Sequence, residues 1–322
     1  MSRIKRFLFT NGTLIATICI FIVVYFIGGQ LYPAMQKPQV FFNLFINNAS
    51  LLIISIGMTL VLLMGGIDLS VGAMIALTSM ASAALLQAGM NPVLVMILML
   101  LMGILFGFTQ GFIIHYLKVE AFIVTLMGLF FARGMAFVIH DNSITIKNDL
   151  YMYLALTKIH IPFFEKAYVY IPTLFGIGLL LVMMFITKNT RFGRTVYAIG
   201  NDEQSAMLMG LPVARVKIIV YSISGFCSAL AGIVFSISLL SGFGDYAKSM
   251  EMDAIASAVI GGTALTGGVG NVFGTLFGVM INGIIVSILQ FNGTLTSWWT
   301  RIGVGALTLI FIGIQSFFYK RK

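Results

Sequence analysis

The residues best placed to do chemistry lie in two glycine-rich stretches of an otherwise apolar chain. The first is GGIDLSVG, which begins at Gly65 and contains one carboxylate, Asp68. A carboxylate at this position can accept hydrogen bonds from the free N–H groups that begin the next helix. Asp68 is therefore either the N-cap of that helix or part of a transport pathway, because ionisable residues inside membranes are usually functional.

The second stretch is VIGGTALTGGVG, residues 259–270. Aligned with the first, it shares Gly, Gly, Leu and Gly, and places Thr266 opposite Ser70. Paired glycine-interrupted segments in two halves of a transporter indicate a site near the repeat interface. The alignment therefore predicts a duplicated five-helix unit. The predicted pathway or gate residues are Asp68, Ser70, Gly261, Gly262 and Thr266.

A polar insert at 188–217 contains a short helix whose two ends are both marked. Asn201 is predicted to be its N-cap, and acidic residues follow where the helix dipole favours negative charge. Gly210 can adopt the left-handed conformation that closes a helix, and Pro212 prevents its continuation. The helix spans about eight residues, or roughly 12 Å. A helix this short needs packing, either on its own transmembrane ends or in a partner's groove.

The elements that must position these residues are membrane-spanning helices. Hydrophobic residues make up 59% of the 322 residues and charged residues only 9%, which predicts an all-α polytopic membrane protein in one domain, 1–322. The segment 252–267 is short enough either to cross fully or to be re-entrant. About ten spans are predicted, at 14–31, 47–65, 71–89, 93–114, 119–140, 169–187, 217–240, 252–267, 272–290 and 299–318.

Basic residues indicate the orientation, because cytoplasmic loops carry an excess of Lys and Arg. If all ten spans cross, one side holds only Lys37, Lys147, Lys158, Lys166 and Lys248. The other side holds Arg3, Lys5, Arg6, Lys118, Lys188, Arg191, Arg194, Arg215, Lys217, Lys320, Arg321 and Lys322. The insert and both termini are therefore predicted to be cytoplasmic. The net charge of +9 is accounted for by topology, and no nucleic-acid partner is expected.

Two further patterns concern packing. Gly103, Gly107 and Gly111 form one GxxxGxxxG series, and 270–278 contains another, which predicts close helix contact, chiefly within the subunit. Arg133 falls inside a predicted span, where a charge is costly. It is expected to face a cavity, a partner or the membrane interface.

Sequence motifs of catalysis are absent: the chain contains no GxxxxGK[ST] phosphate loop, no HExxH and no GxSxG. Cys19 and Cys227 fall inside predicted spans, so neither a disulfide nor a metal site is expected, and no cofactor is predicted. A transport protein without its own ATP site needs an ion gradient, a passive pore or an ATPase partner. An ion-coupled secondary transporter of a small polar solute is therefore one alternative, although it would be expected to keep an ionisable relay in mid-membrane.

Three motifs carry a family resemblance. GGIDLSVG, TRFGRTVYAIGNDEQSAMLMGL and DAIASAVIGGTALTGGVGNVFGTLFG resemble the signature stretches of permease subunits of bacterial sugar ABC importers of the ribose, galactose and xylose type. The similarity extends in order and spacing over nearly the whole chain. RFGRTVYAIG and FNGTLTSWWTRIGVG look most similar to a permease of the galactofuranose importer. The family's Gly-Arg pair in the last motif is replaced by Gly268 and Val269.

This resemblance implies an importer of the bacterial inner membrane with several partners. Two permease subunits would form the pathway, two cytoplasmic ATPase subunits would power it, and a periplasmic binding protein would deliver a monosaccharide. The second permease would be another copy or a related chain, and lipid would surround both. The insert would be the element that docks into the ATPase. The residues expected to couple to the ATPase are Gly193, Arg194, Gly200, Asn201, Asp202, Glu203, Ala206 and Gly210.

Overall fold

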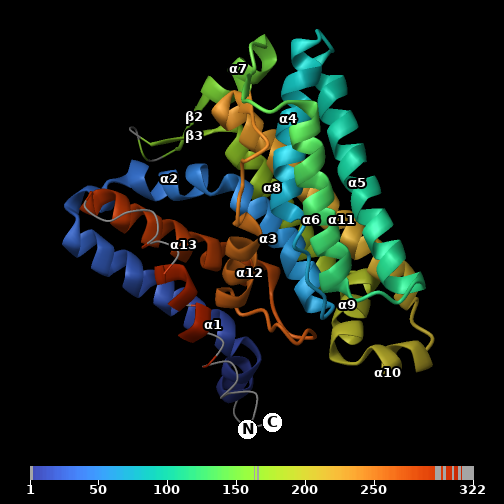
Figure 1. The fold of residues 1–322 in the computed structure, drawn as a ribbon. Helices are drawn as coiled ribbons and strands as arrows, with labels where there is room; N and C mark the ends of the chain where they lie inside the picture. Colours follow the sequence, from blue (N-terminus) through green and yellow to red (C-terminus); the bar gives the residue numbers. More distant parts are fainter. Residues whose placement is uncertain are drawn as a thin grey trace.

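The computed structural model describes residues 3–162, 164, 167–293, 299, 302–306, 308–310 and 313. Helices α4, α5, α6 and α11 stand together on one side of the molecule, α1 and α13 form an arm on the other side, and α3 and α12 lie between them (Figure 1). In chain order the elements are α1 (Arg3–Leu31), η1 (Pro33–Gln36), α2 (Pro38–Asn47), α3 (Ala49–Leu63), α4 (Val71–Gln87), α5 (Pro92–Tyr116), α6 (Ala121–Ile139), β1 (Ile144–Thr145), α7 (Asp149–Leu156), β2 (Lys158–His160), β3 (Tyr168–Tyr170), α8 (Ile171–Asn189), α9 (Arg191–Asn201), α10 (Glu203–Leu208), α11 (Val213–Leu239), β4 (Ser241–Gly242), α12 (Met250–Ile260) and α13 (Val272–Asn292).

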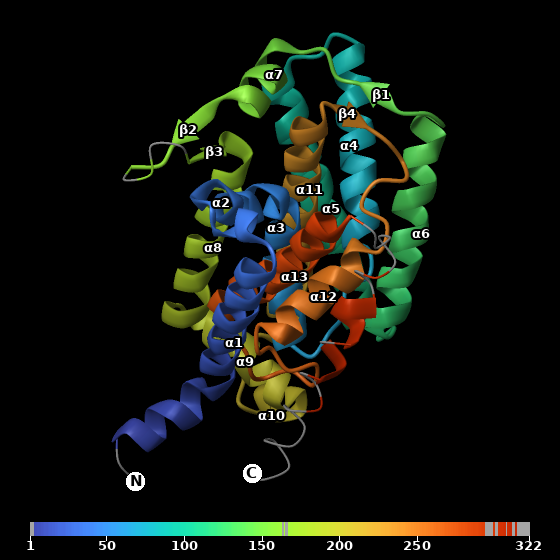
Figure 2. The ribbon, with the colours of Figure 1, turned by 90° about the vertical axis from the view of Figure 1, so that its left-hand side faces the viewer.

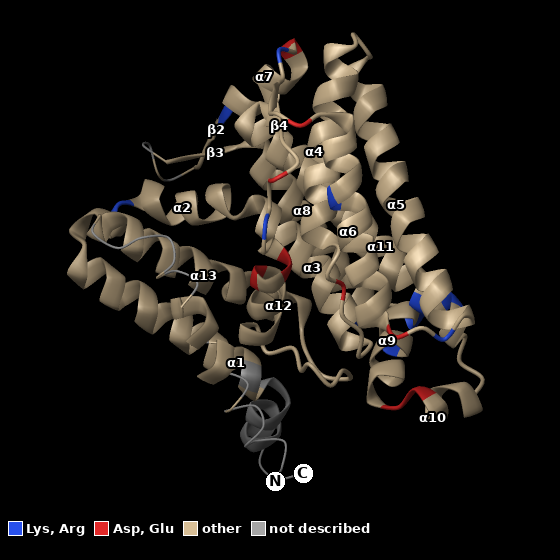
Figure 3. Cartoon of the chain, viewed as in Figure 1, with Lys and Arg blue, Asp and Glu red and all other residues tan. Residues whose placement is uncertain are grey.

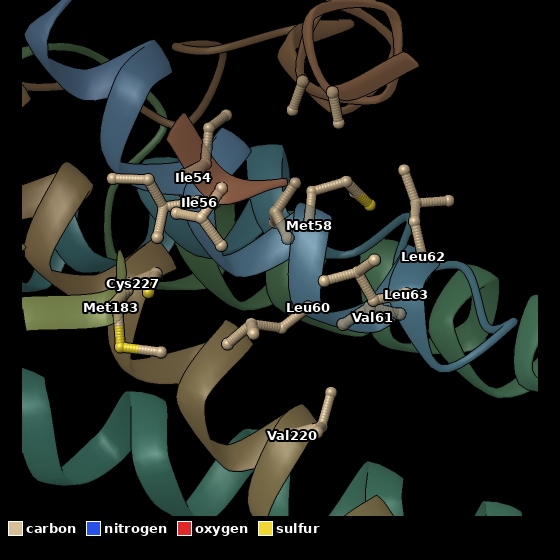
Figure 4. Packing of buried hydrophobic residues seen from close by; sticks show 14 of the residues in the cluster. Ile54, Ile56, Met58, Leu60, Val61, Leu62, Leu63, Met183, Val220 and Cys227 are labelled. Carbon is tan, nitrogen blue, oxygen red and sulfur yellow. The ribbon is translucent and has the colours of Figure 1, made fainter. Parts of the chain in front are cut away.

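The core is built around α3, whose 15 residues are all buried. A helix that is surrounded by protein on every side must be apolar all round, and its sequence, ASLLIISIGMTLVLL, has that character. It packs on α8, α11, α12 and α13, and Figure 4 shows its aliphatic side chains next to Val220 and Cys227 of α11. One of its few polar groups, the Thr59 hydroxyl, lies 2.7 Å from the Thr275 hydroxyl of α13. This central position fixes the end of α3, where the first glycine-rich break begins.

Both glycine series make close helix contacts within this chain. A Cβ at Gly107 would overlap the carbonyl of Tyr221, and one at Gly111 would lie 2.8 Å from Cα of Ile218, so α5 lies directly against α11. Gly274 and Gly278 approach the backbone of α12 in the same way. The predicted packing within the subunit is confirmed, because small residues let the helix backbones approach one another.

Six of the predicted spans coincide with helices that are long and apolar enough to cross a membrane: α1, α5, α6, α8, α11 and α13. A seventh is obtained if α2 and α3, which meet at an angle of 55°, count as one bent span. Within the described residues, α4 is apolar but shorter than these helices, and α12 has only 11 residues. Half of the residues of the predicted span at 299–318 lie outside the described residues. The structure therefore gives a multi-pass helical membrane protein with six or seven candidate spans, fewer than the predicted ten.

The two ends of the molecule differ in character. At one end, which we call the α7 end, β1 pairs with β4 and β2 pairs with β3, both antiparallel. At the other, the α9–α10 end, lie the insert and the two glycine-rich breaks (Figures 1 and 2). Between β4 and the second break the chain runs through an irregular segment, residues 243–249, and then through α12. The segment 252–267 is thus not a continuous helix: α12 ends at Ile260, where the glycines of the second break begin.

Candidate transport site

The first break, residues 64–70, encloses the Asp68 carboxylate in a buried hydrogen-bond network. Asp68 is 1% exposed. Its Oδ1 accepts from the backbone N–H of Ser70 at 2.9 Å and from the Ser70 hydroxyl at 2.6 Å, while Oδ2 accepts from the Ser224 hydroxyl of α11 at 2.6 Å. The Gln110 amide of α5 donates to the Ser70 hydroxyl at 3.0 Å. A buried carboxylate with three donors is held in place, and here it connects α4, α5 and α11.

This network corrects the first reading of Asp68 as the N-cap of α4. The N-cap is Ser70, and the Asp68 side chain binds the N–H of that cap residue rather than one in the first helical turn. The network also lies inside the layer of spanning helices. Gln110 is six positions before the end of α5, about 9 Å along the axis, and a Cβ at Gly128 of α6 would lie 3.4 Å from Cβ of Ser70.

The second break, residues 261–270, contacts the first through backbone rather than side chains. The N–H of Gly268 donates to the carbonyl of Leu63 at 2.9 Å. A Cβ at Gly267 would lie 2.9 Å from Cα of Gly65, so the two breaks meet at their glycines. The predicted side-chain pairing does not form: Ser70 is buried with Asp68, whereas Thr266 is exposed. Gly261 and Gly262 are buried where they end α12.

Helix α9, the first half of the insert, packs against the second break and against the last residue of α3, which directly precedes the first break. It begins with the Thr190 hydroxyl accepting from the N–H of Gly193 at 3.2 Å, and Gly193 is buried while Arg194 is exposed. Gly200, near its end, leaves no room for a side chain, because a Cβ would overlap the Leu63 carbonyl and lie 2.5 Å from the Gly268 nitrogen. We call this meeting point of Leu63, Gly65, Gly200, Gly267 and Gly268 the junction. The three sequence motifs therefore converge at one place.

A tyrosine gives α9 a second attachment to the second break. The Tyr197 hydroxyl donates to the Gly270 carbonyl at 2.9 Å. This bond and the contacts of Gly200 lie on successive turns of α9, so a rotation or translation of α9 would move the 261–270 loop with it.

Helix α10, the second half of the insert, begins one residue later than predicted. Asn201 is the last residue of α9, and the N-cap of α10 is Asp202, whose side chain accepts from the N–H of Ser205 at 3.0 Å. The predicted cap position is wrong because α9 continues through Asn201, whose side-chain amide donates to the Tyr197 carbonyl within that helix. Hydrogen bonds from both the backbone and the side chain of Ser205 lower the pKa of Asp202 below its usual value.

The C-terminal end of α10 agrees with the sequence prediction. Gly210 has φ +74°, in the left-handed region. Its N–H donates to Met207 and the N–H of Leu211 donates to Ala206, which together form a Schellman motif. Pro212 is the residue that precedes α11. Nothing lies within 4 Å of a Cβ at Gly210, so glycine is needed there for its conformation and not for space.

The face that α10 exposes is apolar and differs from the one expected. Met207, Leu208 and Met209 are 52%, 89% and 67% exposed, whereas Ala206 is 0% exposed and belongs to the hydrophobic core. Ala206 was expected to face a partner. That expectation is wrong, because the helix turns this side chain into the chain's own core. We call Met207, Leu208 and Met209 the α10 tip.

An ion pair and a pocket lie beside the α10 tip. Glu203 binds Lys217 of α11 at 2.6 Å, and both are partly buried. Figure 3 shows Lys and Arg positions in blue near the base of α11 and acidic positions in red at the start of α10. The pocket, of about 600 Å³, is lined by Met64, Gly65, Gly66, Ile114, His115, Tyr116, Lys118, Val119, Glu120, Ala121, Glu203, Met207, Lys217 and Tyr221. It therefore reaches from the insert to the first break.

Sequence reasoning missed Ser224 and Gln110, the partners that complete the Asp68 network. The signal that could have found them is a polar residue inside an apolar span, since such residues need a hydrogen-bond partner there. Among the residues that the structure describes, no group of three or more His, Cys, Asp or Glu side chains is arranged to hold a metal ion. The hydrogen bonds and close backbone contacts of this site connect helices to one another and do not form a catalytic group.

The fold is a multi-pass helical bundle with two glycine-rich breaks and a polar insert. Residues 40–313 match the family model described as the permease component of the branched-chain amino acid transport system, and the chain belongs to this family. Its members transport solutes, so this protein is a membrane permease and not an enzyme.

The chain is also similar to curated permeases over almost its whole length. It is 42% identical to the inner membrane ABC transporter permease protein YjfF of Escherichia coli strain K12, over 95% of this chain and 92% of the relative. It is 37% identical to the fructose import permease protein FruG of Bifidobacterium longum, over 94% and 89%. It is 36% identical to the ribose import permease protein RbsC of Bacillus subtilis, over 87% and 85%. The resemblance to sugar ABC importer permeases is confirmed; no solved structure matches the chain.

Proposed function

We propose that this chain is the permease subunit of an ATP-driven importer that carries a monosaccharide across the bacterial inner membrane. The observation that carries the proposal is the junction, where both backbone breaks and the insert contact one another. The names of the relatives indicate the substrate class, since two of those compared are permeases for fructose and ribose. Within this class we propose galactofuranose as the sugar, because the RFGRTVYAIG motif resembles the corresponding sequence of a galactofuranose importer permease.

The insert, residues 188–217, would couple the permease to a cytoplasmic ATPase. The α10 tip is an apolar surface on a polar helix, and an exposed apolar patch of this kind indicates a protein partner. A force applied to α10 would reach α9 through the Asp202 cap, and α9 contacts the second break and the end of α3 at the junction. Movement of the docked insert would thus reach the buried network of Asp68 without any covalent chemistry on this chain.

Partners and orientation follow from the same reading. The pathway would be completed by a second permease, either another copy or a related chain, and a periplasmic binding protein would deliver the sugar at the α7 end. We propose that the α9–α10 end and both termini face the cytoplasm, because the basic residues are concentrated in those segments. We further propose that the chain crosses the membrane ten times, with the irregular segment 243–249 and α12 together making one crossing.

Asp68 keeps one alternative open, an ion-coupled secondary transporter of a small polar solute. A buried carboxylate at membrane depth is what such a transporter uses to bind a cation. Here, however, both carboxylate oxygens already accept hydrogen bonds from Ser70 and Ser224. These three bonds hold the carboxylate to α4 and α11 and favour a structural role.

The test is sugar uptake into proteoliposomes that contain this permease, its partner ATPase and any second permease, with the periplasmic binding protein supplied outside. ATP enclosed in the vesicles should drive accumulation of radiolabelled galactofuranose or D-ribose, and a proton or sodium ionophore should have no effect. Accumulation that needs an ion gradient and no ATP would replace the proposal with the secondary transporter. Equilibration without accumulation would indicate a passive channel.

A further inference from the structure

The irregular segment 243–249 exposes a pair of charged side chains, and the first turn of α12 exposes a methionine. Lys248 and Asp245 form an ion pair at 2.7 Å, with 65% and 38% of their side chains exposed. Met252 in the first turn of α12 is 55% exposed, whereas its neighbour Glu251 is buried. We call Asp245, Lys248 and Met252 the exposed wall.

This wall lies at membrane depth. Arg133 of α6 donates from Nη1 to the carbonyls of Gly244 at 2.8 Å and Tyr246 at 2.6 Å. Arg133 lies twelve positions after Ala121 and six before Ile139, about 18 Å and 9 Å from the two ends of α6 at 1.5 Å per residue. The hydrocarbon layer is about 30 Å thick. A segment bound to Arg133 therefore lies well inside it.

The segment has a defined shape, since its backbone is held from two sides. Ala247 and Ser249 have φ of +55° and +67°, a conformation that non-glycine residues rarely adopt. A Cβ at Gly72 of α4 would lie 2.7 Å from the Ala247 carbonyl, so α4 holds one side while Arg133 holds the other. The Tyr246 ring also packs on Phe235 at 5.3 Å.

We propose that the exposed wall faces a water-filled passage for an uncharged, polyhydroxylated solute, and that Arg133 is the positioning residue that keeps the wall in this shape. An exposed ion pair at this depth is costly against lipid tails, and irregular backbone at membrane depth occurs where it lines a cavity or is buried in protein. A neutral sugar suits a wall whose opposite charges are paired with one another. The inference rests on the proposed function, because a second permease would supply the opposite wall.

The experiment compares two cysteines of similar exposure on different faces of the molecule. Cys19 is exposed and is first replaced by Ala, whereas the buried Cys227 is retained. Met252→Cys, at a position 55% exposed, is placed in this background, and Leu105→Cys, at 62% exposure on α5, is the control, because α5 lies at the outer edge of the helices, away from α12 (Figure 1). The complete transporter in proteoliposomes is treated with a charged methanethiosulfonate reagent, which needs a water-exposed thiolate. Met252→Cys should react at least about tenfold faster than Leu105→Cys; equal rates would overturn the passage.

The role of Arg133 is tested on the same thiol. Arg133→Gln combined with Met252→Cys should change the modification rate by about threefold or more, because the carbonyls of Gly244 and Tyr246 lose their cationic donor. Arg133→Lys, which keeps a positive charge within reach, should restore most of the original rate. An unchanged rate with Arg133→Gln would remove the positioning role. If the Gln variant does not fold, a rate with Arg133→Lys that differs from the original by about threefold or more would remove it instead.

The water-filled passage and the ATP-driven importer can be disproved separately, because the rate of cysteine modification does not depend on transport. ATP-driven D-ribose uptake with equal rates at the two cysteines would overturn the passage alone. Faster reaction at Met252→Cys without ATP-driven uptake would overturn the ATP-driven importer, while the water-facing wall stands.

Discussion

The two helices of the insert are neighbours in the chain but are attached to the protein in opposite ways. Helix α9 buries Val196 and Ile199, and at Gly200 it contacts the backbone of Leu63 at the end of α3 and of Gly268 in the second break. Helix α10 buries only Ala206 and leaves the α10 tip in the open. The first helix is therefore part of the permease core, and the second presents a surface to something outside it.

This difference shows how one polar loop can serve two purposes. A docking element that packed only on the partner could not transmit the partner's movement to the permease. One that packed only on the permease would offer no surface for the partner to bind. The insert divides at Asp202, where α9 ends and α10 is capped. Helix α9 can therefore transmit movement to the permease core, while α10 is left to bind the partner. The comparison predicts that substitutions in α9 reduce stability of the permease, whereas those at the α10 tip reduce partner binding.

The largest effect is expected at the junction. Gly200→Ala should lower the free energy of unfolding by about 3 kcal/mol or more, because its Cβ would collide with backbone atoms of Leu63 and Gly268 that cannot rotate away. Gly178→Ala in α8 is the matched control, since nothing lies within 4 Å of its Cβ, and it should be neutral or slightly stabilising. Thermal unfolding in detergent measures both. Equal stability of the two variants would mean that α9 is not tightly packed at the junction.

The next effect is on partner binding rather than on folding. Leu208→Asp should reduce co-purification of the ATPase about tenfold or more, because the most exposed residue of the α10 tip would carry a charge into an apolar contact. The stability of the isolated permease should change by less than about 0.5 kcal/mol, as for other surface substitutions. Phe130→Asn, also highly exposed but on a spanning helix, should leave co-purification intact. Full ATPase recovery with Leu208→Asp would remove α10 as the docking element.

The third effect concerns the end of α10. Gly210→Val should destabilise the Schellman motif by about 1–2 kcal/mol, because a β-branched residue is poorly tolerated at positive φ. Gly210→Asn should cost less, since Asn adopts the left-handed conformation more readily. Transport should fall in that order while membrane insertion stays normal. Equal uptake by wild type and Gly210→Val would show that the shape of this turn does not matter for coupling.

Features that depend on neighbouring residues in the sequence were predicted better than features that depend on contacts between distant residues. Gly210 and Pro212 mark the end of α10 because helix termination depends on the residues at that point. The predicted N-cap of α10 was wrong by one residue, because the sequence around Asn201 does not show that α9 continues through this residue. The burial of Ala206 was also not predictable, since it depends on contacts with residues that lie far away in the chain.

The same limit applies to the membrane region. The six long spans follow from apolar length alone, whereas α3 and α12 are shorter because the backbone breaks interrupt them. Aligning the two breaks predicted a duplicated five-helix unit with a site at the repeat interface. Gly65 and Gly267 of the two breaks do lie close together, while the duplication stays a prediction. The side chains of the two breaks do not correspond, because Ser70 is bound into the Asp68 network through Ser224, a residue with no sequence motif of its own.

The smallest effect is the pH dependence of the α10 cap. The folded pKa of Asp202 is lowered by its bonds from Ser205, so the stabilisation that it gives is present above the unfolded pKa, about 3.9. It is lost as the pH falls through the lower folded value. Asp202→Asn keeps a capping oxygen without a titrating group. Pepsin should therefore cut wild type at the α10 tip increasingly faster than Asp202→Asn as the pH falls below about 4. A constant ratio of the two cleavage rates from pH 5 to pH 2 would show that the ionised cap does not hold α10.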